Sequence, residues 1–476
     1  AMGEQGQVVA SASSAYPVRH PFPGWDEQRV VDWWRALRSA TRRVLADPAA
    51  AGVPVAGIGF SGQMHGAVLL GSDHRPLRPA IIWSDARTTE EVARIEEMVP
   101  IRTLVDMTGN RASTSFTASK ILWLAAHEPD LLTRARAIVQ PKDAVRCNLT
   151  GELAADVSDA SATLLFDLRR RTWSTDLCNR LGIEPGLLAP VLESAQPAGQ
   201  VSRAAARVTG LPQGTVVAAG GGDAACSALG VGLGTDEARS PLLITLGTAG
   251  QAFAVSDRPI IEVDGRTHGL CYVAPRAWCQ MGAILRAGSA VEWLAAATSV
   301  RPSRSTVSRL FGVAAATVPA SDDPMFLPYL IGERSPHFDP DVRGAFAGLA
   351  AHHQVGHLAR AVLEGVAFAL RDAADAMAGA GVLWDHLRVS GGGARSQAWL
   401  QIIADAFNVP VEVADTTHGS ARGAAMLGAT AAGWFASVNE AAAAVRSVER
   451  VLLPDPDGVE RSAQRLARFR ELYRPL

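Results

Sequence analysis

Short, mostly apolar runs that end in glycine-containing turns recur along the chain. Such runs occupy residues 55–60, 216–219, 242–245 and 387–390, and a turn with glycine follows each of them. Runs of this length predict buried strands, and glycine keeps the following turn free of side chains. Further strands are predicted at residues 67–70, 80–83, 251–255 and 411–413.

Apolar residues spaced three or four positions apart predict the helices. The longest helix is expected over residues 353–378, where Val355, Leu358, Val362 and Leu370 share one face. Helices are also predicted after Asp26, which would act as the cap, from Thr88 onward, from Ala224 onward, and over residues 118–126, 129–137, 397–407 and 420–434.

The two halves of the chain repeat one pattern. The second half opens on a strand, the turn Leu246–Gly250 and a return strand that ends at Val255. The first half opens on a turn at Gly3–Gly6 and a strand over residues 7–12, as though only the return arm of a matching hairpin were present. Strands that alternate with helices in a repeated pattern predict an α/β protein with a duplicated domain. We place the boundary near 230–242, with domains at 1–236 and 237–476.

Composition narrows the range of partners and the compartment. The 476 residues carry a formal net charge of −2, which gives no reason to expect nucleic acid or acidic lipid as a partner. We expect neither a membrane span, since no run of ~18 uninterrupted apolar residues occurs, nor a signal peptide. The cysteines lie far apart without metal-ligand spacing, which favours the cytoplasm over a disulfide framework. They are Cys147, Cys178, Cys226, Cys271 and Cys279.

Asp223 stands at the end of a predicted strand, directly after Gly220–Gly222. A carboxylate beside open backbone can accept a proton from a bound hydroxyl and so act as a general base. The residues alone leave a second interpretation open, in which Asp223 only caps the helix that follows.

Two other glycine turns are candidates for binding a nucleotide. In Gly247–Gly250, backbone N–H groups and the Thr248 hydroxyl can converge on phosphate oxygens, although plain hairpins use similar turns. Gly391–Gly393 lies between a strand and a helix, where a flat ring can approach the backbone and the helix N-terminus favours an anion. Neither turn continues into the Gly-Lys-Ser/Thr of a Walker motif.

Histidines and charged residues elsewhere allow both functional and structural interpretations. His65 lies in a glycine-flanked loop after a strand, where it can donate a hydrogen bond to a hydroxyl or serve only the structure. The histidines at 352, 353 and 357 are interpreted as an exposed helix start rather than a metal site. Glu333 and Arg334 are interpreted as a loop ion pair without chemistry of its own.

Taken together, these stretches resemble the FGGY family of carbohydrate kinases, and within it the xylulokinases, over nearly the whole chain. The motifs that carry the resemblance occur in the order of the family. They are Ser61-Gly62-Gln63-Met64-His65-Gly66, Gly220-Gly221-Gly222-Asp223, Leu246-Gly247-Thr248, Gly332-Glu333-Arg334-Ser335-Pro336-His337 followed by Asp339 and Arg343-Gly344, and Ser390-Gly391-Gly392-Gly393-Ala394-Arg395-Ser396.

The resemblance implies two duplicated ribonuclease H-like domains, as in actin-like ATPases, that face each other across a cleft. It implies ATP-dependent phosphorylation of D-xylulose, with the sugar mainly on the first domain and Mg-ATP mainly on the second. Asp223 would be the general base on the 5-hydroxyl and would meet Mg²⁺ through water, while Met64 and His65 would hold the sugar. The implied nucleotide-binding residues are Gly247, Thr248, Gly288, Glu292, Gly392, Gly393 and Gln397. Many family members are dimers, so a homodimer is also expected.

Two features depart from the family's pattern. The family usually begins with a strand, an Asp-x-Gly-Thr phosphate loop and a return strand, and this sequence begins after that loop. We therefore expect weak kinase activity and an unpaired strand edge in the first domain. Ala224 stands where xylulokinases commonly carry Asn, which removes one expected sugar contact.

Other functions remain open at this point. One is a kinase of the same family for another ketose or polyol, and another is a binding protein that has lost catalysis with the first phosphate loop. A third is an actin-like or chaperone-like ATPase, against which the polar loops at His65 and Asp223 argue. Saturable stimulation of ATP hydrolysis or phosphoryl transfer by sugar separates a kinase from a plain ATPase.

Overall fold

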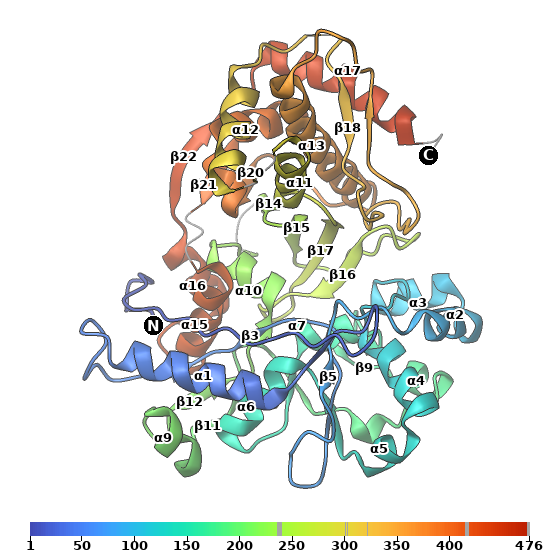
Figure 1. Cartoon of the computed structure of the whole chain (residues 1–476). Helices are drawn as coiled ribbons and strands as arrows, with labels where there is room; N and C mark the ends of the chain where they lie inside the picture. Colours follow the sequence, from blue (N-terminus) through green and yellow to red (C-terminus); the bar gives the residue numbers. More distant parts are fainter. Residues whose placement is uncertain (236–239, 300, 302, 321, 415–417, 474–476) are drawn as a thin grey trace.

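The computed structural model describes residues 1–235, 240–299, 301, 303–320, 322–414 and 418–473. Figure 1 shows two lobes, the first built mainly from the N-terminal half and the second from the C-terminal half. The proposed boundary between residues 236 and 237 lies outside the described residues, so the division into domains stays a prediction. Among the described residues, no helix combines the length and the apolarity needed to cross a membrane.

Short strands and helices make up the first lobe. Its strands are β1 (Glu27–Gln28), β2 (Gly57–Ile58), β3 (Ser61–Gly62), β4 (Val68–Leu70), β5 (Ala80–Ile81), β6 (Ala137–Val139), β7 (Ala155–Asp156), β8 (Phe166–Asp167), β9 (Thr172–Trp173), β10 (Val191–Leu192), β11 (Pro197–Gln200), β12 (Val216–Ala218) and β13 (Gly221–Gly222). Its helices are α1 (Val30–Leu45), α2 (Thr89–Met98), α3 (Ile101–Thr108), α4 (Thr117–His127), α5 (Pro129–Arg134), α6 (Pro141–Thr150), α7 (Val157–Ala160), α8 (Thr175–Arg180), α9 (Arg203–Thr209) and α10 (Asp223–Gly230).

Longer elements make up the rest of the chain. The strands are β14 (Leu242–Leu246), β15 (Gly250–Ser256), β16 (His268–Cys271), β17 (Trp278–Ile284), β18 (Met325–Leu327), β19 (Ala345–Ala347), β20 (Leu387–Ser390), β21 (Val411–Ala414) and β22 (Val448–Leu452). The helices are α11 (Gly288–Thr298), α12 (Arg304–Ala316), α13 (Val355–Gly379), α14 (Gln397–Phe407), α15 (Gly419–Ala431), α16 (Val438–Val445) and α17 (Pro456–Tyr473).

A seven-stranded sheet forms the centre of the second lobe, in the order β16-β17-β15-β14-β20-β21-β22. The predicted hairpin is present: β14 pairs antiparallel with β15, and β14 also pairs parallel with β20. Val362, Val366 and Leu370 of α13 are fully buried in the core over this sheet, whereas Leu358 is only partly buried and Val355, predicted to share the same face, is exposed. The sheet thus holds the turns after β14 and β20 next to each other.

In the first lobe, two pairs of parallel strands place the catalytic candidates side by side. Strand β12 runs parallel to β2, and further along the same two segments β13 runs parallel to β3. Parallel strands end at the same edge of a sheet, where ligand sites of α/β proteins lie. The Met64–His65 loop, which follows β3, and Asp223, which follows β13, therefore share one edge.

Helix α15 from the C-terminal half packs against the first lobe, where Figure 1 shows it beside α10 and β3. The approach is close because glycines face backbone: a Cβ at Gly423 would collide with the Cys226 carbonyl, and one at Gly428 with Ile58 and Gly59. The helix predicted over residues 420–434 is present as α15, which ends at Ala431, and its glycines allow the close packing.

Three local predictions differ from the structure. Helix α1 begins at Val30 with Arg29 as its cap, because the Asp26 carboxylate instead contacts His20 and Ser84. The helix predicted over residues 129–137 ends at Arg134, since residues 137–139 pair with β4. The turn at the start of the chain is present, but of the strand predicted over residues 7–12 only Val8 bridges to Met2.

Candidate functional site

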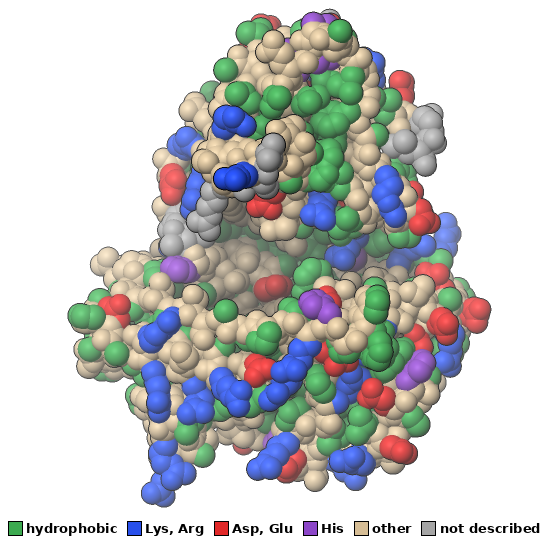
Figure 2. All heavy atoms as spheres, in the orientation of Figure 1, with side chains coloured by type: hydrophobic (Ala, Val, Ile, Leu, Met, Phe, Trp, Pro, Cys, Tyr) green, Lys and Arg blue, Asp and Glu red, His purple; other side chains and the backbone are tan. Residues whose placement is uncertain are grey.

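Figure 2 shows a hollow between the two lobes, and Figure 1 places β3 and α10, which begins at Asp223, on the side of the first lobe that faces the second. Asp223 is the first residue of α10, and its Oδ1 accepts the N–H of Ala224 at 2.9 Å. Its side chain is open to solvent, yet protein atoms surround it closely enough that burial raises its pKa to about 6. A pKa near working pH suits a general base better than a plain cap.

Met64 links the two loops of the first lobe. Its side chain is buried and lies so close to Gly222 that a Cβ there would stand 2.8 Å from Met64 Cγ. The residue before Asp223 is thus in van der Waals contact with the Met64–His65 loop. The structure brings together the three residues predicted to bind sugar.

His65 holds its ring in a fixed protonation state. Its backbone is in the left-handed region, with φ of 69°, and its Nδ1 lies 2.7 Å from the Ala162 carbonyl oxygen. A carbonyl only accepts, so Nδ1 carries the hydrogen, and burial lowers the pKa of His65 to about 3. The neutral ring therefore offers Nε2 as an acceptor, whereas the sequence suggested a donor.

The turn after β14 exposes backbone N–H groups. Among the described residues, neither the Thr248 nor the Ala249 N–H donates to a protein acceptor, and both residues are exposed. The carbonyls of the turn point the other way: Gly288 N–H donates to Gly247 at 2.8 Å, and Ser289 Oγ donates to Thr248 at 2.7 Å. Free N–H groups beside a hydroxyl form a suitable cradle for phosphate oxygens.

Two glycines allow neighbouring loops to approach the turn after β14 closely. A Cβ at Gly288 would stand 2.7 Å from the Gly247 carbonyl oxygen, and one at Gly391 would stand 2.6 Å from that of Leu246. Gly391 also has φ of 92°, which a side chain would strain. The turns predicted to bind nucleotide therefore meet around Leu246 and Gly247.

The remaining predicted nucleotide residues lie around these turns. Gly392 is exposed with open space where a Cβ would be, and Gly393 packs against Leu246 and Trp399. Gln397 is the exposed first residue of α14, and Glu292 is exposed one turn into α11. Among the described residues, no side-chain hydrogen bond or ion pair joins Glu292 or Gln397 to these turns, so their roles stay predictions.

A buried network of charged side chains is hydrogen-bonded to the backbone that precedes Asp223. Ser158 Oγ accepts the Gly222 N–H at 3.0 Å and donates to Asp156 Oδ2 at 2.6 Å. Asp156 Oδ1 in turn lies 2.8 Å from Lys142 Nζ, which also contacts Asp143 and Asp159. The network joins the backbone before Asp223 to an ammonium group that is almost fully buried.

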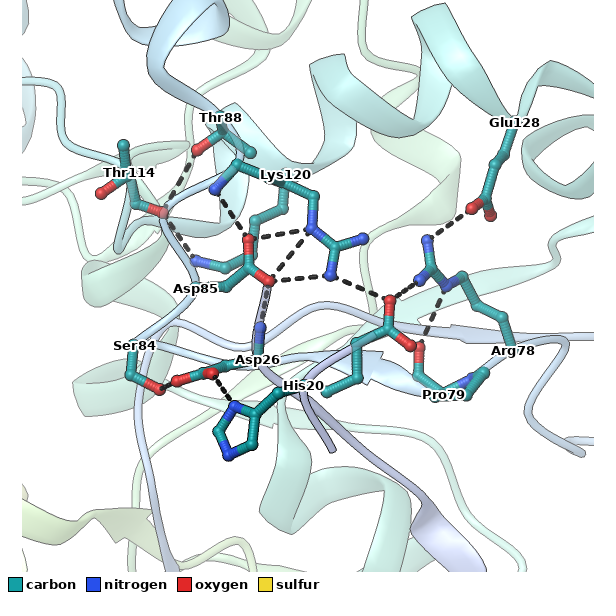
Figure 3. Close-up of polar contacts among 12 residues, drawn as sticks. His20, Asp26, Arg78, Pro79, Ser84, Asp85, Thr88, Thr114, Lys120 and Glu128 are labelled. Carbon is teal, nitrogen blue, oxygen red and sulfur yellow. Dashed lines mark hydrogen bonds and ion pairs between the residues drawn. The ribbon is translucent and has the colours of Figure 1, made fainter. Parts of the chain in front are cut away.

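A second network of hydrogen bonds and ion pairs holds the segment around Phe116, which contacts the Met64–His65 loop. Figure 3 shows Lys120 beside Asp85 and Thr114, and Lys120 Nζ donates to the carbonyls of Thr114 and Phe116 at 3.0 and 3.4 Å. Arg87 binds Asp85 at 2.8 Å and Glu27 at 2.9 Å, which ties this wall to the N-terminal segment. The Phe116 ring then packs edge-on against His65.

The sequence analysis was wrong about Glu333 and Arg334. Within the described residues their side chains form no ion pair; Glu333 Oε1 instead accepts the N–H groups of Leu285 and Arg334 at 2.9 and 2.7 Å. Arg334 reaches the first lobe, where its Nη2 lies 3.5 Å from Ser115 Oγ. No sequence signal pointed to this contact, because the two residues are 219 positions apart.

His268 is another residue that the sequence analysis missed. Its Nδ1 lies 2.9 Å from Asn110 Oδ1, and the Asn110 Nδ2 donates to the Gly269 carbonyl at 2.8 Å. Strand β16 of the second lobe is thereby attached to the first lobe at the edge of the sugar loop. The His268 ring also packs against Phe116.

His352 and His353 precede α13 and His357 lies in its first turn, so these histidines mark a helix start, as predicted. Nδ1 of His353 accepts the Ala350 N–H at 2.9 Å, and Nδ1 of His357 accepts the Gln354 N–H at 3.0 Å. Asp322, His352 and His353 lie close enough to share an ion. Because Nδ1 of His353 is an acceptor, its Nε2 carries the hydrogen in the neutral ring, which does not suit a metal ligand.

Known proteins are similar to this chain over nearly its whole length. The N-terminal domain model of the FGGY family of carbohydrate kinases matches residues 1–230, and the C-terminal domain model matches residues 242–432. A xylulose kinase of Escherichia coli (strain K12) is 36% identical over 476 residues, covering 100% of this chain and 96% of the relative. A xylulose kinase of Bacillus subtilis (strain 168) is 34% identical over 472 residues, covering 99% and 93%.

Solved structures agree with this fold. The crystal structure of xylulose kinase from Rhodospirillum rubrum has a TM-score of 0.89 and 30% identity, covering 98% of this chain and 94% of that one. The predicted fold, two actin-like α/β domains that face each other, is therefore confirmed. The chain belongs to the FGGY family of carbohydrate kinases.

Proposed function

We propose that the protein phosphorylates D-xylulose at its 5-hydroxyl with Mg-ATP as the phosphoryl donor, and that Asp223 is the general base. The observation that carries this proposal is the Asp223 carboxylate, with its pKa raised to about 6, in contact through Gly222 with the Met64–His65 loop. The xylulose kinases among the relatives favour this sugar over another ketose or polyol.

In the proposed reaction, the first lobe holds and deprotonates the sugar. His65 Nε2 accepts a hydrogen bond from one sugar hydroxyl, and Met64 packs against the carbon chain. Asp223 orients the 5-hydroxyl and takes its proton as the oxygen attacks the γ-phosphorus and the bond to the ADP oxygen breaks. Phosphoryl transfer of this kind needs positioning and charge stabilisation more than covalent help.

The turns of the second lobe would hold the nucleotide. The free N–H groups of Thr248 and Ala249 and the Thr248 hydroxyl suit the terminal phosphates, and the open backbone at Gly392 suits the adenosine. The exposed Asp223 carboxylate suits the water ligands of Mg²⁺. When bound, Mg²⁺ would neutralise charge on the phosphate oxygens.

The test of the proposal is ADP release from Mg-ATP with a panel of D-xylulose, D-ribulose, D-gluconate and glycerol. We expect saturable release with D-xylulose and, for each competitor, a kcat/KM at least about tenfold lower. Release that is fastest with another sugar would overturn the proposed substrate, and release that no sugar stimulates would overturn the kinase assignment of the site.

The pH dependence of turnover follows from the Asp223 carboxyl. Because only the ionised form accepts a proton and burial raises the pKa to about 6, kcat/KM for D-xylulose should fall as the pH drops below about 6. Above that pH it should be level. The measurement is a pH profile between 5 and 9 in buffers of constant ionic strength; a profile that stays level down to pH 5 would contradict the role of Asp223.

Gly288→Ala tests the nucleotide turns separately from the sugar loop. The added methyl group would press on the Gly247 carbonyl and displace the turn, so the KM for ATP should rise about tenfold or more while D-xylulose binding stays unchanged. Gly312→Ala is the matched control, because no atom lies within 4 Å of its added Cβ. An unchanged KM for ATP in Gly288→Ala would remove Gly288 from the nucleotide site.

A further inference from the structure

Arg334 is a half-buried cation without a carboxylate partner. Among the described residues the guanidinium forms no ion pair with a carboxylate, and Glu333 Oε1 is occupied by two backbone N–H groups. Burial lowers the pKa of Arg334, with Glu333 as the opposing charge. A partly desolvated cation without an anionic partner carries a cost that a ligand with hydrogen-bond acceptors would offset, which suggests a ligand.

The backbone of Arg334 belongs to the second lobe, whereas its side chain extends to the first lobe. The Ser335 N–H donates to the Ala283 carbonyl at 2.9 Å, which fixes the loop to β17 of the second lobe. From there the side chain reaches Ser115 of the first lobe at 3.5 Å, its one hydrogen bond to the described residues. Most of its N–H groups are therefore available to a molecule in the cleft.

The neighbours of Arg334 show where it lies relative to the Met64–His65 loop. Burial lowers the pKa of His65 and of His268, and the nearby charge of Arg334 lowers both further. Phe116, next to Ser115 in the chain, packs against both of these histidines. Its contact with Ser115 thus places Arg334 beside the residues that border His65.

We propose that Arg334 binds the ketone end of an open-chain ketose and so selects ketoses over polyols. This inference rests on the proposed function, in which the opposite end of the sugar meets Asp223. A guanidinium group only donates hydrogen bonds, and a ketone oxygen only accepts them, so the two match. Neutral His65 offers a hydrogen-bond acceptor to a neighbouring hydroxyl. A polyol carries a hydroxyl in place of the ketone, and a hydroxyl oxygen is a weaker hydrogen-bond acceptor for Arg334 than a ketone oxygen.

The test compares dissociation constants of D-xylulose and of xylitol, which differ only at C2, for the wild type and Arg334→Gln. Isothermal titration without ATP measures binding independently of catalysis. We expect Arg334→Gln to weaken D-xylulose binding about 10- to 100-fold and xylitol binding less than about threefold. Arg334→Lys keeps the charge but loses the fork of donors, and should lie between the two.

Arg343→Gln is the matched control. Arg343 follows in the same loop but is exposed and donates only to the Pro340 and Val342 carbonyls. It should leave both dissociation constants unchanged. The KM for ATP, measured in parallel, should change less than about threefold in all variants.

The outcomes separate the inference from the proposed function. Equal weakening of D-xylulose and xylitol in Arg334→Gln, or no weakening of either, would overturn the inference while D-xylulose-dependent ADP release by the wild type still supports the proposed function. A wild type that neither binds nor phosphorylates D-xylulose would overturn both. If Arg334→Gln does not fold, the Arg334→Lys titration decides in the same way.

Discussion

Asp223→Ala should lower kcat for D-xylulose phosphorylation about 10²- to 10⁴-fold, the contribution of a positioned general base. The carboxylate stands alone at the start of α10, so no described acid in contact with it can replace it. The KM for ATP should change little, because the nucleotide turns belong to the other lobe. Turnover close to that of the wild type would remove Asp223 from the mechanism.

Asp223→Asn adds a stability measurement that separates catalysis from misfolding. Burial raises the pKa of the folded carboxyl from its ordinary value of 3.8 to about 6, so ionisation at neutral pH opposes folding. Asn removes that penalty, and the variant should melt at a higher temperature than the wild type at pH 8. The difference should shrink as the pH falls through 6 and vanish below about 4.

The control for both variants is Asp130→Ala. Asp130 is exposed on α5, which Figure 1 places at the end of the first lobe far from the second. Its replacement should leave kcat and the melting temperature at pH 8 within error of the wild type. A loss of activity in Asp130→Ala similar to that in Asp223→Ala would show that the assay reports on folding.

The catalytic candidates were predictable because their signals are local. The strand, the three glycines and Asp223 lie within eight consecutive residues, and β12 and α10 form where that pattern placed them. The same holds for the hairpin β14–β15 and for Gly391–Gly393. In each case a buried run followed by glycine leaves few alternative structures.

Contacts between distant segments were not predictable from these patterns. The pairing of Arg334 with Ser115 depends on how two lobes meet, and the cap predicted at Asp26 was lost to Ser84, a residue 58 positions away. Neither partner shows a periodicity or spacing that relates it to the other. Local propensity is a weak guide wherever a polar side chain finds a tertiary partner.

Lys142→Met should destabilise the protein by about 3–5 kcal/mol, the cost of removing one partner from a buried ion pair. The side chain of Lys142 is 1% exposed, and those of Asp143 and Asp156 are fully buried. Lys142 raises the network's stability by holding the pKa of Asp156 below its usual range. Without the ammonium group, Arg146 would be left to balance Asp143, and Asp156 would lose its ion-pair partner and keep only the hydrogen bonds from Ser158 and Ser194.

The effect of Lys142→Met should depend on pH with a definite sign. Loss of Lys142 raises the folded pKa of Asp156, so the variant gains stability as protons bind and loses it as the pH rises. The gap in unfolding free energy between wild type and variant should therefore narrow from pH 8 to pH 5. Urea unfolding followed by tryptophan fluorescence measures it, with exposed Arg134→Met as a control that should change the free energy by less than about 0.5 kcal/mol.

The double variant Lys142→Met with Asp156→Asn separates charge from packing. It removes one ammonium and one carboxylate while Asn can still accept from Ser158, so it should recover part of the stability lost in Lys142→Met. Recovery of kcat should follow, since the Ser158 hydroxyl holds the Gly222 N–H before Asp223. A double variant no more stable than Lys142→Met would mean that Lys142 acts through packing against Gly62 rather than through its charge.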